Sequence, residues 1–285
     1  MMNPVFKNPS LQKNFSEKGY VVMPLLDEAE VQKLLRLFEL HKNQYQSPFH
    51  TSHFSTDKNY KQQVNDSIIK TVFPKTKVLM VDYRPVFGNF MIKNPGSDYF
   101  MPLHADWTYA DEDQFRSIAI WIPLVDTDEM NGCLGVIEGS HKVLNKIRGP
   151  RIQQSSYRND KTWVKKFGKL LPVKAGHAVI YDHALMHYSP PNRSGEIRPA
   201  LNLSMVPEEA EVIHYCIPEG ATEIEVYSVK ENSFYINYDN YQRPETNSLI
   251  KTLPADTVMW IDGKMDNFGM KKKGVVQKVL DLFSL

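Results

Sequence analysis

The feature that most constrains the fold is a series of short apolar or alternating segments between residue 78 and about residue 230. Turn residues separate these segments, and most of them follow one another without a helical stretch between. Seven or more strands arranged in this way favour an antiparallel sandwich or barrel of the jelly-roll type. The predicted strand segments are 78–93, 99–107, 117–124, 133–140, 177–183, 199–207 and 223–229. We therefore expect a mainly β fold with flanking helices.

The segments that flank the predicted sheet have different patterns. Helical apolar spacing over 8–19 and 27–44 predicts two helices with a short strand between them, and Asp27 with Glu30 three residues later forms a capping signal for the second helix. Residues 45–70 are polar with scattered aromatic residues and show no clear period, which predicts a long loop or a broken helix that could act as a lid. The dipeptide Asn131-Gly132 predicts a tight hairpin turn.

No internal repeat or low-complexity linker divides the chain, so we expect one domain over residues 1–285. Its parts would be N-terminal helices and a lid loop (1–77), a β core (78–230) and a C-terminal extension (231–285) that ends in an amphipathic helix. A basic, partly helical insertion (142–169) would interrupt the core. We expect its cations to lie on a solvated face. They include Arg148, Arg151, Lys165 and Lys166.

Composition excludes several classes of function. The 34 basic and 33 acidic residues leave a formal charge of +1, which disfavours nucleic acid or a membrane surface as a partner. Cys133 and Cys216 are the only cysteines, too few for a disulfide framework, and a reducing compartment fits best. The N-terminus has no apolar stretch of signal-peptide length, and no segment has the 18 or so apolar residues of a membrane span. We expect a cytoplasmic protein.

The tripeptide His104-Ala105-Asp106 carries the chemistry in the segment 101–107. If this segment is a strand, His104 and Asp106 point to the same face. Two imidazoles and one carboxylate on one face of an octahedral Fe(II) ion would leave three positions open for a cosubstrate and O₂. A further histidine on another strand must then complete the set.

His183 and His187 are the two candidates for that third ligand. The residues before them predict a strand and the residues after them a turn, so both cannot easily face one centre, and we favour His187. Arg198 follows eleven residues later at the start of the next predicted strand, and a turn between antiparallel strands would bring it near His187. A buried arginine there could hold a carboxylate in two hydrogen bonds.

These motifs together resemble the phytanoyl-CoA dioxygenase family of Fe(II)- and 2-oxoglutarate-dependent oxygenases. The similarity rests on H-x-D at 104–106, H-x-S at 187–189, the following "PPNRS" and Arg198. The stretch "IWIPLVDTDEMNGCLGVIEGSHK" and the opening "EKGYVVMPLLDEAEVQKL" also resemble the family, so that the resemblance covers residues 10–206. No single motif is specific, but the joint pattern is.

The resemblance implies a double-stranded β-helix in which His104, Asp106 and His187 bind Fe(II). Arg198 would hold the distal carboxylate of 2-oxoglutarate, with Ser189 as a second partner. Lys93 and Trp121 resemble positions that line the same pocket. A dioxygenase of this kind uses O₂ and releases succinate and CO₂ as it hydroxylates, desaturates or cyclises a small organic substrate at an unactivated C–H. Because relatives that halogenate have a small residue in place of Asp106, we expect no halogenation.

Two other functions remain open at this stage. One is a cupin-like metalloenzyme with the same metal ligands and no use of 2-oxoglutarate, and the other is a noncatalytic binding protein on the same fold. The remaining histidines have structural explanations: His183 as a core residue behind the metal, His177 and His141 in turns, and His50 and His53 in an exposed loop. Tyr99, Tyr109 and Asn202 could line the pocket.

Overall fold

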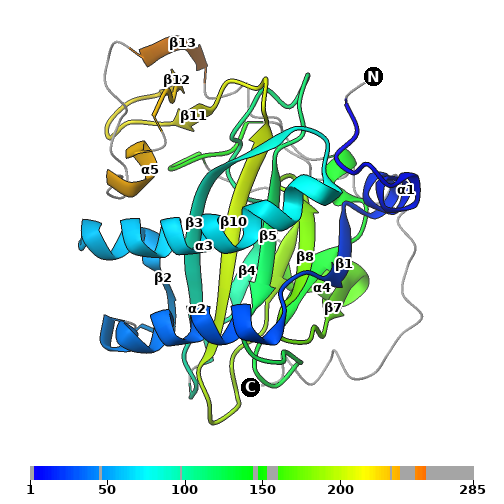
Figure 1. Cartoon of the computed structure of the whole chain (residues 1–285). Helices are drawn as coiled ribbons and strands as arrows, with labels where there is room; N and C mark the ends of the chain where they lie inside the picture. The colour runs from blue at the N-terminus through cyan, green and yellow to red at the C-terminus, as the bar shows by residue number, and fades with distance from the viewer. Residues whose placement is uncertain are drawn as a thin grey trace.

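The structure is a computed structural model, and it describes residues 3–44, 47–96, 98–143, 147–152, 160–231, 233–237 and 248–254. Antiparallel sheets form its centre, and helices cover one side of it (Figure 1). The helices are α1 (Pro9–Lys18), α2 (Glu28–Leu40), α3 (Lys58–Leu79), α4 (Asp160–Phe167) and α5 (Ser233–Asn237), with 3₁₀ turns at Lys42–Gln44, Ser52–Phe54 and Ser140–Lys142. The helix expected near the C-terminus and most of the extension from residue 231 lie outside the described residues.

The described strands form three sheets. Their bounds are β1 (Tyr20–Pro24), β2 (Phe49–Thr51), β3 (Tyr83–Lys93), β4 (Met101–His104), β5 (Ile118–Pro123), β6 (Leu134–Ile137), β7 (Gly168–Leu171), β8 (His177–Asp182), β9 (His187–Ser189), β10 (Arg198–Pro207), β11 (Ile213–Cys216), β12 (Glu223–Ser228) and β13 (Leu249–Pro254). The large sheet has the order β1-β8-β5-β10-β3-β2, the small sheet β4-β9-β6-β7, and the third β11-β12-β13. Each of the seven predicted segments contains a strand, so the prediction of a mainly β, jelly-roll-type fold is confirmed.

The central strands β5, β8 and β10 of the large sheet are buried on both faces, and their side chains alternate between two sets of neighbours. On β5, Ile118, Ile120 and Ile122 belong to the apolar core that includes the helices, whereas Ala119 and Trp121 pack with residues of the small sheet. The strands β8 and β10 follow the same alternation. The period of two therefore directs one row of each strand into the space between the two sheets, and that space contains the candidate site.

For residues 45–70 the sequence predicts a long loop or a broken helix, and from Lys58 onward the structure has the helix α3. Residues 58–79 form 22 residues of helix that lie across the large sheet in front of β3 and β10 (Figure 1). The helix begins after Asp57, whose side chain accepts a hydrogen bond from the Tyr60 amide at 3.0 Å. Its buried stripe of Val64, Ile68 and Val72 has helical i, i+4, i+8 spacing. Of the expected lid, the described residues outside this helix are β2, a 3₁₀ turn and short connections.

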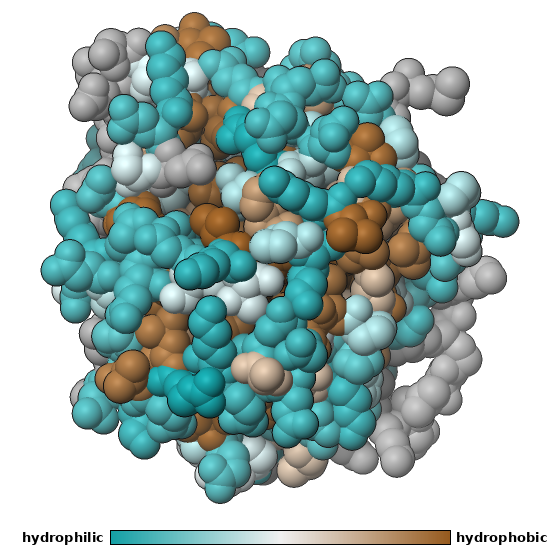
Figure 2. Space-filling view, in the orientation of Figure 1, coloured by the Kyte–Doolittle hydropathy of each residue, from teal (hydrophilic) through white to brown (hydrophobic). Residues whose placement is uncertain are grey.

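The N-terminal elements agree with the prediction. The helix α2 begins after Asp27, which forms the capping box with Glu30: the Asp27 carboxylate accepts from the Glu30 amide at 2.9 Å, and the Glu30 carboxylate accepts from the Asp27 amide at 3.0 Å. The face that carries α2 and α3 is mainly hydrophilic, with apolar residues visible between the polar ones (Figure 2). No helix within the described ranges is long and apolar enough to cross a membrane.

The predicted hairpin at Asn131-Gly132 is wrong. Gly132 has a positive φ of 80°, but Asn131 does not, and the strands on either side of the turn belong to different sheets. Side chains shape this connection instead: Asp128 accepts from the amides of Met130 and Asn131, and the Asn131 amide group donates to the Asp126 carbonyl. A Cβ at residue 132 would approach the Pro190 carbonyl to 2.6 Å, which explains the glycine.

Candidate active site

The strands β4 and β9 bring two histidines face to face. The pairing of these strands is irregular between Met101 and His104, with Met101 opposite Ser189 and His104 opposite His187. The bulge in β4 places the two imidazole rings on one side of the small sheet, with their centroids 4.1 Å apart. His187 is buried, and His104 is half-buried.

Backbone carbonyls fix the orientation of both rings. His104 Nδ1 lies 2.7 Å from the Pro102 carbonyl, and His187 Nδ1 lies 3.0 Å from the Leu185 carbonyl. A carbonyl can only accept, so each Nδ1 carries a hydrogen, and Nε2 is the nitrogen of each ring that remains for a metal. Burial and the adjacent His187 lower the pKa of His104 to about 4, which keeps its ring neutral at pH 7. Both rings are thus prepared to coordinate a metal.

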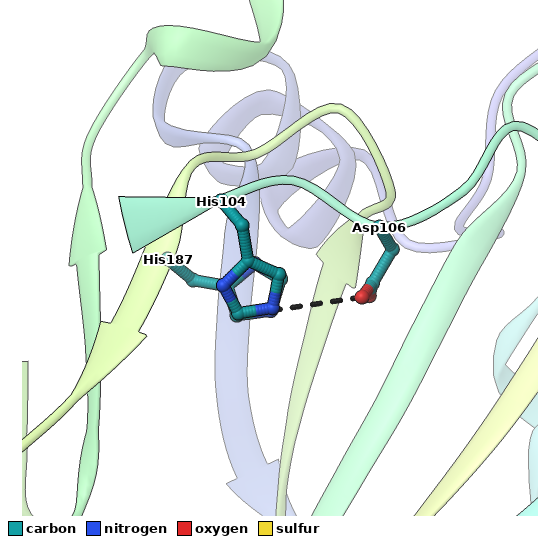
Figure 3. A group of neighbouring side chains, drawn as sticks. All are labelled: His104, Asp106 and His187. Carbon is teal, nitrogen blue, oxygen red and sulfur yellow. Dashed lines mark ion pairs between the residues drawn. The ribbon is translucent and has the colours of Figure 1, made fainter. Parts of the chain in front are cut away.

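Asp106 lies opposite these rings but outside the strand, because β4 ends at His104. Its Oδ1 is 3.7 Å from His187 Nε2 (Figure 3). Its Oδ2 accepts a hydrogen bond of 2.9 Å from the Tyr181 hydroxyl. Burial would raise the pKa of Asp106, but the nearby imidazoles and the Tyr181 hydroxyl hold it below its ordinary value. The side chain is therefore a carboxylate at neutral pH, and 25% of its surface is exposed.

The donor atoms of His104, Asp106 and His187 fit a single metal ion. All lie within 4.8 Å of one another, whereas two donors bound to one ion at about 2.1 Å can be at most about 4.2 Å apart. Small side-chain movements that shorten the distances between the donor atoms would thus let all three residues bind one ion. Two neutral imidazoles and one carboxylate on one side of a centre are the donor set typical of non-haem Fe(II).

The ring of His183, the alternative ligand, does not belong to this cluster of donor atoms. Its side chain is fully buried, neither ring nitrogen has a hydrogen-bond partner among the described residues, and its ring packs 5.0 Å from that of Tyr109. Burial lowers its pKa to about 3. The main chain of His183 nevertheless serves the site, because its carbonyl accepts the Asp106 amide at 3.0 Å.

A pocket next to the two histidines extends between the sheets. Its lining residues are Phe49, Met91, Met101, His104, Trp121, Leu134, Tyr181, His187, Tyr188, Ser189 and Arg198. Arg198 is only 3% exposed, and its guanidinium lies over the Trp121 ring at 5.6 Å. It begins β10, which pairs with β3 and β5 and not with β9, so the two sheets bring Arg198 and His187 together, in place of the expected turn.

Arg198 is poorly satisfied by the protein. Nη1 donates to the Met91 carbonyl at 3.3 Å, and Nε has no hydrogen-bond partner among the described residues although it is buried. Burial lowers the pKa of Arg198 to about 10, so the group stays charged at neutral pH. A buried cation with unused donors requires an anionic partner, and a carboxylate matches the planar fork of the guanidinium.

Lys93, predicted to line the same pocket, is buried beside it and is not among its lining residues. Its ammonium donates to Ser189 Oγ at 2.7 Å, to the Ser189 carbonyl at 2.9 Å and to the Pro190 carbonyl. Burial and the nearby Arg198 lower the pKa of Lys93 to about 6. Lys93 therefore connects β3 to Ser189, and the Ser189 hydroxyl donates in turn to the Gly132 carbonyl at 3.0 Å.

Several sequence predictions near the site differ from the structure. Tyr99, Tyr109 and Asn202 do not line this pocket, and Tyr99 stacks on Phe49, which does. His53 is buried, not exposed, and packs against Phe87, Phe54 and Trp107, while His50 is half-buried. His141 is buried in the 3₁₀ turn after Gly139, as predicted, whereas His177, expected in a turn, begins β8.

The sequence reasoning missed two contributors. Tyr181, which bonds to Asp106, gave no signal beyond its place in a predicted strand. Arg148 was predicted to be solvated, but it is 2% exposed and forms an ion pair with the equally buried Glu112 at 2.6 Å. The other cations of the insertion fit better: Arg151 and Lys165 are exposed and Lys166 is half-buried.

Comparisons with known proteins agree with this geometry. The model of the phytanoyl-CoA dioxygenase (PhyH) family matches residues 15–200, more than half of the chain. Phytanoyl-CoA dioxygenase 1 of Oryza sativa subsp. japonica is 30% identical over 122 residues, which are 42% of this chain and 43% of the rice protein. The phytanoyl-CoA dioxygenase of Arabidopsis thaliana is 32% identical over 132 residues, 43% of this chain and 45% of the plant protein. The alignments thus span less than half the length of these curated relatives.

Solved structures share the fold. The α-ketoglutarate-dependent carbocyclase SnoK from nogalamycin biosynthesis has a TM-score of 0.54 at 18% identity, covering 74% of this chain and 89% of SnoK. HygX from Streptomyces hygroscopicus, crystallised with nickel and 2-oxoglutarate, has a TM-score of 0.52 at 14% identity, covering 71% of this chain and 88% of HygX. At such identities the likeness establishes the jelly-roll architecture. The family match establishes more: the chain belongs to the phytanoyl-CoA dioxygenase (PhyH) family.

Proposed function

We propose that this protein is an Fe(II)- and 2-oxoglutarate-dependent dioxygenase that oxidises an unactivated C–H of a small organic molecule, with release of succinate and CO₂. The observation that carries the proposal is the placement of His104, Asp106 and His187 around one point at the mouth of a pocket that contains a buried, poorly satisfied arginine. The three side chains would hold the iron. Bound iron supplies the activation of O₂ that an organic side chain cannot provide.

The residues of the pocket have separate tasks in this proposal. The Arg198 guanidinium would bind the distal carboxylate of 2-oxoglutarate in two charge-assisted hydrogen bonds. The Ser189 hydroxyl would be a second donor once it turns from the Gly132 carbonyl, to which it donates in this structure. Lys93 would serve the cosubstrate through Ser189, which it holds in place. Trp121 would form one wall and exclude water from the guanidinium. Tyr181 would keep the Asp106 carboxylate oriented toward the histidines.

The residue at position 106 favours hydroxylation, desaturation or ring closure over halogenation. A carboxylate that coordinates the metal occupies the position that a halide would need, and Asp106 already faces His187 at 3.7 Å. The substrate is best described as a small organic molecule. The whole chain is proposed to act as one domain, with residues 78–230 as its core.

The decisive experiment needs no substrate, because added ascorbate can supply the two electrons that reduce the second oxygen atom to water in place of a substrate. We expect Fe(II)-dependent succinate formation from 2-oxoglutarate and O₂. His187→Ala should abolish it, and His183→Ala, a change of another buried histidine four residues away, should retain it. Equal loss in both variants would contradict the ligand set. Full metal-dependent activity in Arg198→Ala would favour a metalloenzyme that does not use 2-oxoglutarate, and absence of metal binding would favour a noncatalytic binding protein.

A further inference from the structure

The position of Asp106 needs an explanation, because this residue follows the end of β4 and no strand partner fixes it. Two hydrogen bonds hold its main chain instead. Its amide donates to the His183 carbonyl at 3.0 Å, and its carbonyl accepts from Arg148 Nε at 2.7 Å. Both backbone groups of the candidate metal ligand are therefore satisfied, one of them by the side chain of a residue 42 positions later in the chain.

Arg148 is bound to the same segment at further points. Nη1 and Nη2 donate to the two carboxylate oxygens of Glu112 at 2.9 and 2.6 Å. The Arg148 amide donates to Thr108 Oγ1 at 3.2 Å, and the Thr108 amide donates to the Arg148 carbonyl at 3.1 Å. Arg148 thus makes hydrogen bonds to residues 106, 108 and 112. It thereby holds the segment 106–112, which begins with Asp106, at both of its ends.

The main chain next to Arg148 is itself tightly placed. A Cβ on Gly149 would lie 1.9 Å from the Tyr215 carbonyl oxygen, so the backbone here packs directly against β11. Pro150 adds a hydrogen bond to this contact, because its carbonyl accepts from the Ile217 amide at 3.2 Å. The third sheet therefore supports the arginine, and the arginine supports the metal ligand.

Stability alone does not explain a charge pair at this depth. The side chains of Arg148 and Glu112 are each only 2% exposed. The loss of hydration of two buried charges offsets most of the free energy of their attraction, so a protein with two apolar residues in place of such a pair is often equally stable. The pair does orient the Arg148 side chain, because two hydrogen bonds to the Glu112 carboxylate fix the plane of the guanidinium and direct Nε toward the Asp106 carbonyl.

We propose that Arg148 is a positioning residue of the metal site, which acts through the Asp106 main chain and is itself oriented by Glu112. This inference rests on the proposed function, since it requires that Asp106 bind a metal. Residues that orient metal ligands typically affect metal affinity by about 10–100-fold. We therefore expect a change in the metal dissociation constant while the protein remains folded.

The test compares variants of the full-length protein by anaerobic calorimetric titration with Fe(II), and with Co(II), whose visible absorption reports the coordination geometry. Arg148→Met alone leaves Glu112 buried without its partner and is expected to unfold readily. The double variant Arg148→Met with Glu112→Leu removes both charges and should melt near the wild-type temperature. We expect it to bind Fe(II) about 10–100-fold more weakly and to show a changed Co(II) spectrum.

Two controls complete the design. Glu112→Gln leaves Arg148 buried without a counter-charge and should lower the melting temperature. It keeps a side-chain oxygen that can accept from Arg148, so the folded variant should retain the bond to Asp106 and bind Fe(II) within about threefold of wild type. Arg151→Met removes an exposed arginine three residues away, paired at 3.3 Å with the exposed Glu219, and should change nothing. Wild-type metal affinity and Co(II) spectrum in a stable double variant would overturn the inference and leave the proposed function intact. Failure of wild-type protein to bind Fe(II) would overturn both.

Discussion

Replacement of Arg198 by glutamine gives a quantitative test of the pocket. The guanidinium is buried over Trp121, Nε has no partner among the described residues, and Nη1 has a single long bond to the Met91 carbonyl. Two charge-assisted hydrogen bonds to a carboxylate contribute about 1.5–3 kcal/mol each. Loss of both should weaken 2-oxoglutarate binding by about 3–6 kcal/mol, or roughly 10²–10⁴-fold. Arg198→Lys should lose about half of that free energy, because an ammonium cannot form the planar fork.

Titration of the Fe(II)-loaded protein with 2-oxoglutarate under nitrogen measures this affinity directly. Fe(II) affinity should be unchanged in Arg198→Gln, since this residue is not one of the proposed ligands. Arg193→Gln is the matched control, because Arg193 lies five residues earlier, is 36% exposed and pairs with the exposed Asp98 at 3.8 Å. If Arg198→Gln binds 2-oxoglutarate within threefold of wild type, the assignment of this arginine is wrong.

Three further changes test the surroundings of the site. Gly135→Ala should lower the free energy of unfolding by about 1–3 kcal/mol, and with it the melting temperature, because its Cβ would lie 2.4 Å from the Tyr188 ring. Gly195→Ala adds its Cβ in open space and should leave the melting temperature unchanged in the same thermal scan. Burial, and to a lesser degree Arg116, lowers the folded-state pKa of His141 from 6.5 to about 4, so its contribution to stability is complete above pH 6.5 and falls toward pH 4. In urea unfolding, His141→Gln should remove about 2 kcal/mol of the stability that is lost between pH 7.5 and pH 5, a loss to which the other buried histidines also contribute. An unchanged pH slope in this variant would contradict the buried neutral ring. Asp27→Ala should lose the capping box of α2 and cost about 1 kcal/mol in the same assay.

Predictability of the fold depended on whether a pattern was local. Most of the described strands could be predicted because each is a short apolar run between turn residues, whereas β2, β7, β9, β11 and β13 lay outside the predicted segments. The cap of α2 could be predicted because Asp27 and Glu30 are three residues apart. The helix α3 could not, although Val64, Ile68 and Val72 lie on one stripe, because polar residues and Pro74 dilute that stripe. Packing against β3 selects the helix: a Cβ on Gly88 would lie 2.9 Å from Ile68.

The candidate site divides in the same way. The spacing of His104 and Asp106 is visible in the sequence, but the reason that they meet is not: a bulge pairs His104 with His187, and Asp106 is held by hydrogen bonds beyond the strand. Arg148 lies in a basic stretch, the usual sign of a solvated surface. Its burial depends on the ion pair with Glu112, which lies 36 residues earlier, and a local sequence pattern does not predict an ion pair between residues so far apart.

The central claim is that the three side chains form a working iron site that also accepts 2-oxoglutarate. The most direct measurement is the anaerobic visible absorption of the metal-free protein, titrated first with Fe(II) and then with 2-oxoglutarate, beside His187→Ala and His183→Ala. We expect a charge-transfer band that requires both additions, is lost in His187→Ala and persists in His183→Ala. Tight Fe(II) binding without that band would contradict the use of 2-oxoglutarate, and no Fe(II) binding would leave His104 and Asp106 as two polar residues beside a pocket.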